Sequence, residues 1–208
     1  MSLINALNWR YAVNEFSPQT LSQTQLSGLI ESVRLAPASY GIQPYKLIVI
    51  TRDEVKQACL THSYGQNKVV NCSHLLVFAH QTEVTTANIR HFIAQLALTQ
   101  NKPVSVLQQY QTQIEHDLLS RTALQQSQWA EQQCYIALGT LLTYAAANEI
   151  DACPMTGFDS VGINQVLKLH EQGLSAAILC PVGIRAADDS SAQRPKHRLT
   201  RDQLVMSM

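Results

Sequence analysis

The sequence lacks any apolar stretch near the roughly 18–20 residues that a membrane-spanning helix needs. It also lacks an excess of either charge, because 15 Lys and Arg balance 15 Asp and Glu. A balanced chain carries no general basic field, so we expect neither nucleic-acid nor membrane partners. The N-terminus MSLINALNWRY has no charged start and no cleavage site. We therefore expect no signal peptide and a cytoplasmic protein.

The cysteines form no C-x-x-C pair, and their number, five, is odd. Scattered thiols of this kind favour reduced cysteines in a bacterial-type cytoplasm over a disulfide framework. The seven histidines form no H-x-x-x-H motif and no cluster paired with carboxylates. We accordingly expect no metal site.

Several catalytic motifs are also missing. The sequence has no G-x-S-x-G elbow, and Cys153 precedes a proline without an identifiable base partner. Neither G-x-x-x-x-G-K-[ST] nor G-x-G-x-x-G occurs. These absences argue against hydrolase, P-loop and dinucleotide-Rossmann chemistry.

What the chain does contain is typical of a folded protein. It has 208 residues, of which 46% are hydrophobic. This length and composition favour one domain, residues 1–208, with one sizeable core.

The hydrophobic pattern alternates helices with strands. Ser22 and Gln25 resemble a capping box, and apolar residues then recur at helical spacing until Pro37. Further helices are predicted over 53–60, 83–101, 104–119, 123–148 and 159–170, and strands over 46–50, 74–80, 152–153 and 175–184. The alternation favours an α/β or an α+β layer, and periodicity does not choose between them.

Two features suggest a ligand site. Basic residues lie near both ends of the chain, at Arg10, Lys196 and Arg198. They are either ordinary solvated termini or a clamp for a phosphate group, which calls for several Lys or Arg donors. The segment 154–159 (PMTGFD) lies between a predicted strand and a predicted helix. Its glycine either makes a turn or lets backbone N–H groups approach a flat ligand.

Five separated segments together resemble the FMN-dependent nitroreductase family, in particular its oxygen-insensitive NAD(P)H nitroreductase and dihydropteridine reductase types. They occur in the family's order and span nearly the whole chain. The segments are Arg10-Tyr11 with Phe16, Pro37–Ser39 with Gln43–Tyr45, Tyr64–Lys68 with Ser73-His74, Pro154 with Gly157–Asp159, and Pro195-Lys196 with Arg198.

The resemblance implies an α+β fold with a central, mostly antiparallel sheet flanked by helices. It also implies an intertwined homodimer with two FMN molecules in the interface. The helix over 123–148 would then be the main dimer helix, and the polar C-terminal tail would wrap across the partner.

The same resemblance assigns roles to individual residues. Arg10, Lys196 and Arg198 would bind the FMN phosphate, and Tyr11 and Ala12 belong to the same cofactor-binding set. A wall from the neighbouring subunit would come from Pro37, Ala38, Ser39 and Gly41. The pyrimidine edge would face Asn67 and Lys68, and the isoalloxazine ring would lie along Pro154, Thr156 and Gly157. Gln133 would add a polar contact.

The implied activity is a ping-pong reaction that takes hydride from NAD(P)H and reduces a small-molecule acceptor, namely a nitroaromatic, a quinone or a pterin. No side chain need act as a nucleophile, since the flavin carries the hydride. Lys68 would stabilise negative charge on the reduced ring. We expect the substrate pocket to involve His62, Tyr64 and the helix over 104–119.

The chain departs from the family pattern at four positions. Ala12 and Ala38 stand where the family has hydroxyl residues, Asn14 replaces a frequent Lys, and Thr156 stands where close nitroreductases usually carry Glu. The lost Ser and Glu groups suit a rival interpretation, an FMN-binding carrier or regulatory protein with little turnover. A scaffold without a cofactor is the third interpretation.

Overall fold

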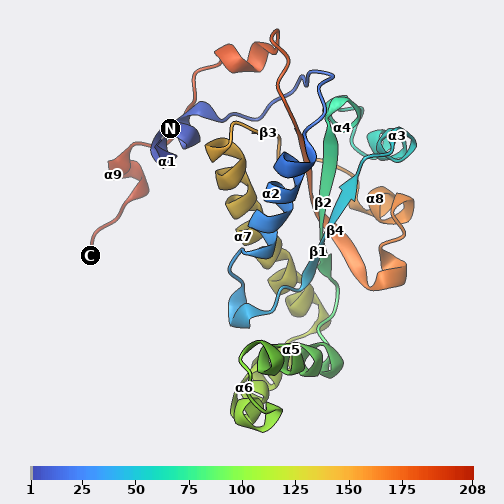
Figure 1. Ribbon diagram of the computed structural model, residues 1–208, viewed down its shortest axis with the longest axis vertical. Helices are drawn as coiled ribbons and strands as arrows, with labels where there is room; N and C mark the ends of the chain where they lie inside the picture. The colour runs from blue at the N-terminus through green and yellow to red at the C-terminus, as the bar shows by residue number, and fades with distance from the viewer. Residues whose placement is uncertain (1) are drawn as a thin grey trace.

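The computed structural model describes residues 2–208. Within them, four antiparallel strands form one sheet in the order β1-β2-β4-β3 (Figure 1). The strands are β1 (Tyr45–Ile50), β2 (His74–Gln81), β3 (Asp151–Ala152) and β4 (Leu174–Gly183). With helices on both faces of this sheet, the fold is α+β, as the family resemblance implied.

The central strand β2 is buried along almost its whole length because both of its faces are covered. Successive side chains of a strand point to opposite faces. Leu76 and Phe78 accordingly enter the core on one side, and Leu75 and Val77 enter the core on the other.

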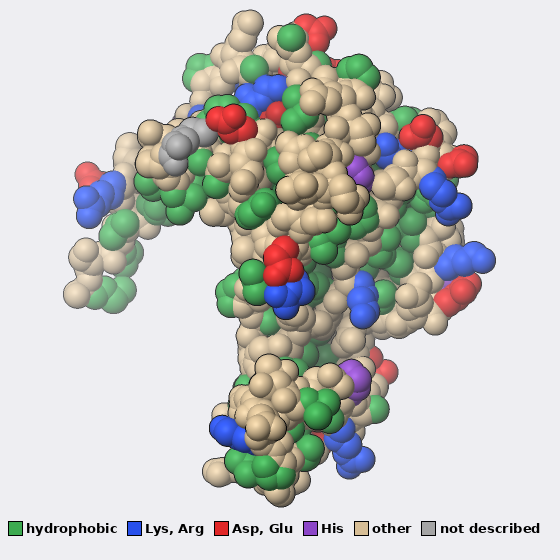
Figure 2. Space-filling model, in the orientation of Figure 1, with side chains coloured by type: hydrophobic (Ala, Val, Ile, Leu, Met, Phe, Trp, Pro, Cys, Tyr) green, Lys and Arg blue, Asp and Glu red, His purple; other side chains and the backbone are tan. Residues whose placement is uncertain are grey.

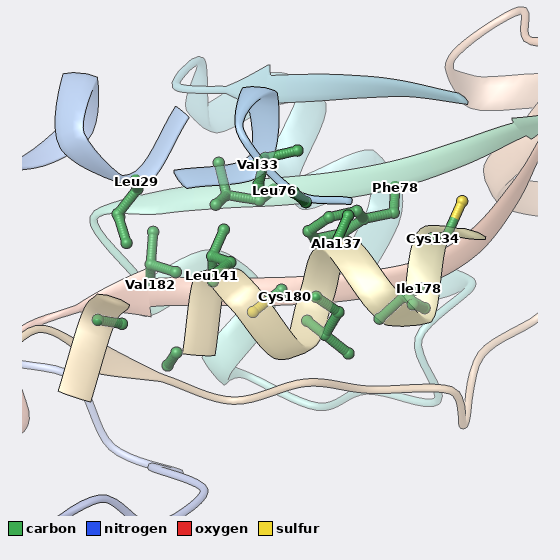
Figure 3. Close-up of a cluster of buried hydrophobic side chains, with 14 of the residues drawn as sticks. Leu29, Val33, Leu76, Phe78, Cys134, Ala137, Leu141, Ile178, Cys180 and Val182 are labelled. Atoms are coloured by element: carbon green, nitrogen blue, oxygen red, sulfur yellow. The ribbon is translucent and has the colours of Figure 1, made fainter. Parts of the chain in front are cut away.

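The helices α2 (Gln23–Arg34) and α7 (Ala123–Ala147) cover the first face. Capping boxes begin both helices, at Ser22 for α2 and at Thr122 for α7. Figure 3 shows their apolar side chains meeting those of β2 and β4. Through this contact α7 forms the main helix of the first layer.

The second face is covered by α3 (Asp53–Thr61), α4 (Lys68–Asn71) and α8 (Ser160–Val166). The predicted helix over 159–170 was too long. It ends at Val166 because Lys168 takes a left-handed conformation with φ of 53°, and His170–Gln172 form a separate 3-10 helix, η3.

A helical pair projects from one end of the molecule (Figure 1). It consists of α5 (Thr86–Thr99) and α6 (Gln108–Leu119), joined through the 3-10 helix η2 (Val104–Leu107). Its core reaches Trp129 and Ala130 in α7 and Ile42 before β1. The predicted break at Pro103 is confirmed.

At the other end lie α1 (Leu3–Trp9), the 3-10 helix η4 (Ser190–Gln193) and α9 (Arg201–Leu204). These helices, like α4, were not predicted, because each is too short for a helical period to emerge. Figure 2 shows apolar side chains on the C-terminal segment around α9, where this segment stands away from the rest of the molecule. The exposed apolar residues of the tail include Leu199, Leu204, Val205, Met206 and Met208.

All five cysteines are buried and unpaired, in agreement with reduced thiols. Burial raises the pKa of the Cys59 thiol to about 11 and those of Cys72 and Cys134 to about 12. Burial likewise raises the pKa values of Cys153 and Cys180. Such thiols carry almost no thiolate at neutral pH and are poor nucleophiles.

Two structural features are absent from residues 2–208. No helix there combines the length and the apolar character that crossing a membrane requires. No group of three or more His, Cys, Asp or Glu side chains gathers there in a way that could hold a metal ion.

Candidate functional site

Residues from both ends of the chain line a cleft of about 590 Å³. Ligand sites typically have volumes of roughly 300–1,000 Å³. One wall is the segment around Arg10, and the other is the tail around Lys196. The lining residues are Asn8, Trp9, Arg10, Tyr11, Ala12, Asn14, Ser191, Ala192, Arg194, Pro195, Lys196, His197 and Arg198.

The three predicted phosphate-binding residues meet in this cleft. Burial and the nearby charge of Arg198 lower the pKa of the half-buried Arg10 guanidinium. Burial, Arg10 and Arg198 lower the pKa of Lys196. Within residues 2–208, no ion pair joins any of these three cations to a carboxylate. The cleft therefore concentrates positive charge that the described residues do not neutralise.

Lys196 has a structural contact as well. Its Nζ donates to the backbone oxygens of Leu7, Asn8 and Arg10 at 2.7, 2.9 and 2.6 Å. The last carbonyls of a helix have no partners within the helix and favour a nearby cation. Lys196 therefore fastens the tail to the C-terminal end of α1 and holds the backbone of Arg10 in place.

The donor set fits a phosphate group. In the described part of the chain, the Arg10 side chain makes no hydrogen bond, so its planar set of donors remains available. Within residues 2–208, the buried Tyr11 hydroxyl also makes no hydrogen bond, and burial raises the pKa of Tyr11 to about 12. Ala12 lines the cleft without contributing a hydroxyl donor.

Arg185 holds the N-terminal wall against the sheet. Its guanidinium carbon lies 4.1 Å from the ring centre of Trp9 and 4.5 Å from that of Tyr11. The same guanidinium donates to the buried Asp151 carboxylate at 2.9 and 2.6 Å. Ala12 also pairs with Ala152 in a parallel bridge. These contacts fix Arg10 and Ala12 relative to β3.

Lys68 is the first residue of α4, and its side chain extends toward the N-terminal segment that lines the cleft. Its Nζ donates to Oδ1 of Asn14 at 2.7 Å. Its charge also opposes the rise that burial causes in the pKa of Cys153. Asn67, the residue before it, is exposed. Lys68 thus lies between the N-terminal segment and the segment that follows β3.

That segment continues along the edge of the sheet. Met155 pairs with Leu179 of β4, while Pro154 is half-buried and Thr156 and Gly157 are exposed. The backbone N–H groups of Thr156 and Gly157 have no protein acceptor in the described part of the chain. They are available to a ligand, as the role predicted for them requires.

The two residues predicted to line the substrate pocket lie on the loop after α3. The His62 ring contacts Asp159 at 3.2 Å through Nδ1, and Asp159 caps α8 through the N–H of Val161. Tyr64 is 71% exposed and adopts a left-handed conformation with φ of 53°. Gln66 ties this loop to the carbonyl of Gly157 at 3.0 Å. The loop is thus held beside 157–159, and the substrate role stays a prediction.

The predicted wall, residues 37–41, does not line the cleft of its own chain. The Gln133 side chain is buried and accepts the backbone N–H of Ser39 at 2.9 Å. Gln43 donates to the carbonyls of Arg34 and Ala36, which satisfies the end of α2. Pro37, Ala38, Ser39 and Gly41 therefore lie beside the first half of α7.

In Figure 1 the segment 37–41 and the two terminal segments that line the cleft lie toward opposite ends of α7. Gln133 contacts the segment 37–41 through Ser39. Ala147 is the last residue of α7 and precedes β3, which borders the cleft. Gln133 and Ala147 are 14 positions apart, about 21 Å at a helical rise of about 1.5 Å per residue. The two halves of the predicted flavin site are thus separated within one chain.

Sequence reasoning missed several lining residues of the cleft, among them Trp9, Asn14 and Arg194. It also missed Arg185, Asp189 and Ser191, which support the cleft. Asp189 accepts the N–H of Ser191 and so caps η4, and a local Asp-Ser-Ser pattern of this kind is a detectable cap signal. Arg185 gives no such signal, because its partners Trp9, Tyr11 and Asp151 are distant in sequence.

The fold and this cleft define an α+β protein that can hold an anionic ligand between the two ends of its chain. Residues 7–184 match the model of the "Nitroreductase family", and the chain belongs to that family.

Relatives and solved structures agree with this assignment. The chain is 30% identical over 174 residues to "Putative NAD(P)H nitroreductase SH0546" of Staphylococcus haemolyticus, covering 80% of this chain and 78% of that protein. It is 28% identical over 215 residues to "Putative NAD(P)H nitroreductase YfkO" of Bacillus subtilis, covering 98% and 96%. A nitroreductase structure from Exiguobacterium sibiricum, described as "putative" and "in complex with FMN", has a TM-score of 0.85 at 17% identity and covers 100% and 98%. That last likeness concerns the fold alone.

Proposed function

We propose that two copies of this chain bind FMN at their interface and use it to reduce a small-molecule acceptor with hydride from NAD(P)H. The observation that carries this proposal is the group Arg10, Lys196 and Arg198, which no described carboxylate neutralises. A phosphate monoester brings about −1.5 to −2 charges to such a group. The FMN complex of the Exiguobacterium sibiricum protein supports the choice of cofactor.

The separation of the two halves of the predicted site supports the involvement of a second copy. The wall around Ser39 and the cleft around Arg10 lie toward opposite ends of α7. A two-fold axis across α7 would place the wall of one copy near the cleft of the other. The outer face of α7, with Tyr135, Ile136 and Gly139 exposed, suits such a contact.

When bound, FMN supplies the ring that accepts and donates hydride. In this proposal Arg10 and Arg198 donate to the phosphate. Lys196 adds its charge, while its own three donors hold the backbone of α1 and Arg10. Lys68 presents positive charge to the pyrimidine edge, and the free N–H groups of Thr156 and Gly157 donate to the ring. Nitroaromatics, quinones and pterins are the proposed acceptors.

The direct test is a titration of the protein with FMN, followed by anaerobic reduction with NADH or NADPH. We expect saturable flavin binding, bleaching of the bound flavin by a nicotinamide, and turnover with a nitroaromatic. Binding of FMN without reduction by either nicotinamide would favour the carrier. The Ser and Glu side chains that Ala12 and Thr156 replace are the losses that suit this interpretation. A protein that stays colourless with FMN would contradict both functions.

The variant Arg10→Gln tests the phosphate contact. Removing one charged donor should weaken FMN binding about 10- to 100-fold, or about 1.4–2.7 kcal/mol. Flavin fluorescence quenching measures the change. The matched control is Arg34→Gln, which removes an exposed arginine paired with Glu31 and should leave the affinity unchanged.

A further inference from the structure

Lys68 is held by an uncharged partner. Its half-buried ammonium donates to Oδ1 of Asn14 at 2.7 Å. Within residues 2–208, no ion pair joins it to a carboxylate. An ammonium has three donors. Asn14 thus fixes its direction without neutralising its charge.

Asn14 is itself fixed from the other side. Its Nδ2 donates to Oγ of Ser191 at 2.7 Å, and its backbone N–H donates to Oδ2 of Asp189 at 3.2 Å. Because an ammonium only donates, Asn14 must turn its oxygen toward Lys68 and its NH₂ group toward Ser191. The hydrogen bonds therefore permit one orientation of the amide.

The outer end of this chain of contacts is rigid. Asp189 and Ser191 are 3% and 7% exposed, and the Asp189 carboxylate also accepts the N–H of Ser191 at 3.0 Å. Burial favours the neutral acid, but hydrogen bonds from Ser191 and Asn14 hold the pKa of Asp189 below its usual value. A charged, buried cap on the tail thus supports Asn14.

We propose that Asn14 is a positioning residue that aims Lys68 at the pyrimidine edge of bound FMN and thereby sets the preference of the site for reduced over oxidised flavin. This role depends on the FMN site proposed above. Two-electron reduction places negative charge at this edge of the ring, and a preorganised ammonium stabilises developing charge more than a mobile one. Through Ser191, the same contact makes the redox balance depend on the C-terminal tail.

The test is the midpoint potential of FMN bound to the full-length protein, measured beside the dissociation constant of oxidised FMN. In Asn14→Leu the preference for reduced flavin should fall by up to about tenfold, which is a shift of about 30 mV to more negative potential for a two-electron couple. Asn14→Asp should shift it further, because a carboxylate would pair with Lys68. Lys68→Met should give the largest shift, and adding Asn14→Leu to it should change nothing more.

Gln57→Leu is the matched control, since it exchanges an exposed amide for leucine on α3, outside the cleft, and its potential should equal that of the wild type. If Asn14→Leu weakens oxidised FMN binding while the potential stays constant, Asn14 is merely structural and the proposal is wrong. The proposal is also wrong if Asn14→Leu shifts the potential equally in the Lys68→Met background.

A second readout needs no flavin. Acetylation of Lys68 in the apoprotein, followed by mass spectrometry, should be faster in Asn14→Leu than in the wild type. Equal rates would contradict the contact itself. Failure of the wild type to bind FMN would instead overturn the proposed function while this comparison still tested the contact.

Discussion

The imidazoles of His74 and His80 are each only 6% exposed. His80 contacts Ser127 through Nε2 at 3.0 Å, and its buried Nδ1 has no partner in the described part of the chain. Burial lowers the pKa of both rings, and the charge of Lys56 lowers that of His74 further. Both side chains therefore favour the neutral form in the folded protein.

These shifts predict a loss of stability in mild acid. The unfolded chain binds protons near the ordinary histidine pKa of about 6.5, while the folded chain binds them only at lower pH. The free energy of unfolding should thus fall as pH decreases below about 6.5, by about 1.4 kcal/mol per unit of pKa difference. Urea unfolding at a series of pH values measures this.

A pair of variants assigns the effect. His80→Gln should flatten the pH dependence, whereas His91→Gln on the exposed side of α5 should leave it unchanged. Identical slopes for the wild type and His80→Gln would exclude His80 as a source.

At the scale of elements, the start of α8 is packed tightly against α3. A Cβ added at Gly162 would lie 1.8 Å from Nδ1 of His62 and 2.3 Å from two further ring atoms. We predict that Gly162→Ala destabilises the fold by about 1–3 kcal/mol, the usual cost of overpacking. Chemical unfolding measures the loss, and adding His62→Ala should recover part of it. Equal losses in the single and double variants would contradict this explanation.

The pairing of Arg185 with Asp151 joins the N-terminal segment to the sheet. Asp151 is 3% exposed, so its loss would leave a cation without its buried partner. Asp151→Ala should cost about 3 kcal/mol and increase hydrogen exchange over residues 10–16. The control is Glu31→Ala, which breaks the exposed pair with Arg34 and should cost no more than about 1 kcal/mol. Unchanged exchange over 10–16 in Asp151→Ala would show that other contacts hold the segment.

The sequence was informative where the signal is local. The capping box at Ser22 predicted the start of α2, and continuous apolar runs predicted β1, β2 and β4. The predicted helix after Asp159 was too long, because no local sequence signal predicts the left-handed conformation of Lys168. Within the site, Arg10 and Lys196, which the family resemblance assigns to the phosphate, line one cleft, and their binding role stays a prediction.

Contacts between distant residues account for what could not be predicted. Asn14 and Ser191 are 177 positions apart, and periodicity carries no information on such a pairing. The carbonyl partners of Lys196 depend likewise on the fold, which brings the tail beside α1. The chemistry of these residues was visible in the sequence, but their partners were not.

At the scale of the whole molecule, the single domain and the homodimer stay predictions. Gly139 offers a direct test of the dimer, because a Cβ added there meets no atom within 4 Å. Gly139→Trp should therefore leave the protomer folded but prevent close approach of a second α7. Analytical ultracentrifugation should show a shift from dimer to monomer, with Gly139→Ala close to the wild type. An unchanged dimer in Gly139→Trp would place the interface elsewhere.

The burial of all five cysteines gives the chain internal reporters of opening. A thiol-specific dye would react only when the layer above a given sulfur separates. Cys134 lies in the layer of α7, and Cys59 lies in the layer of α3 and α8. Their labelling rates would distinguish which side of the sheet opens first, without adding any foreign probe to the protein.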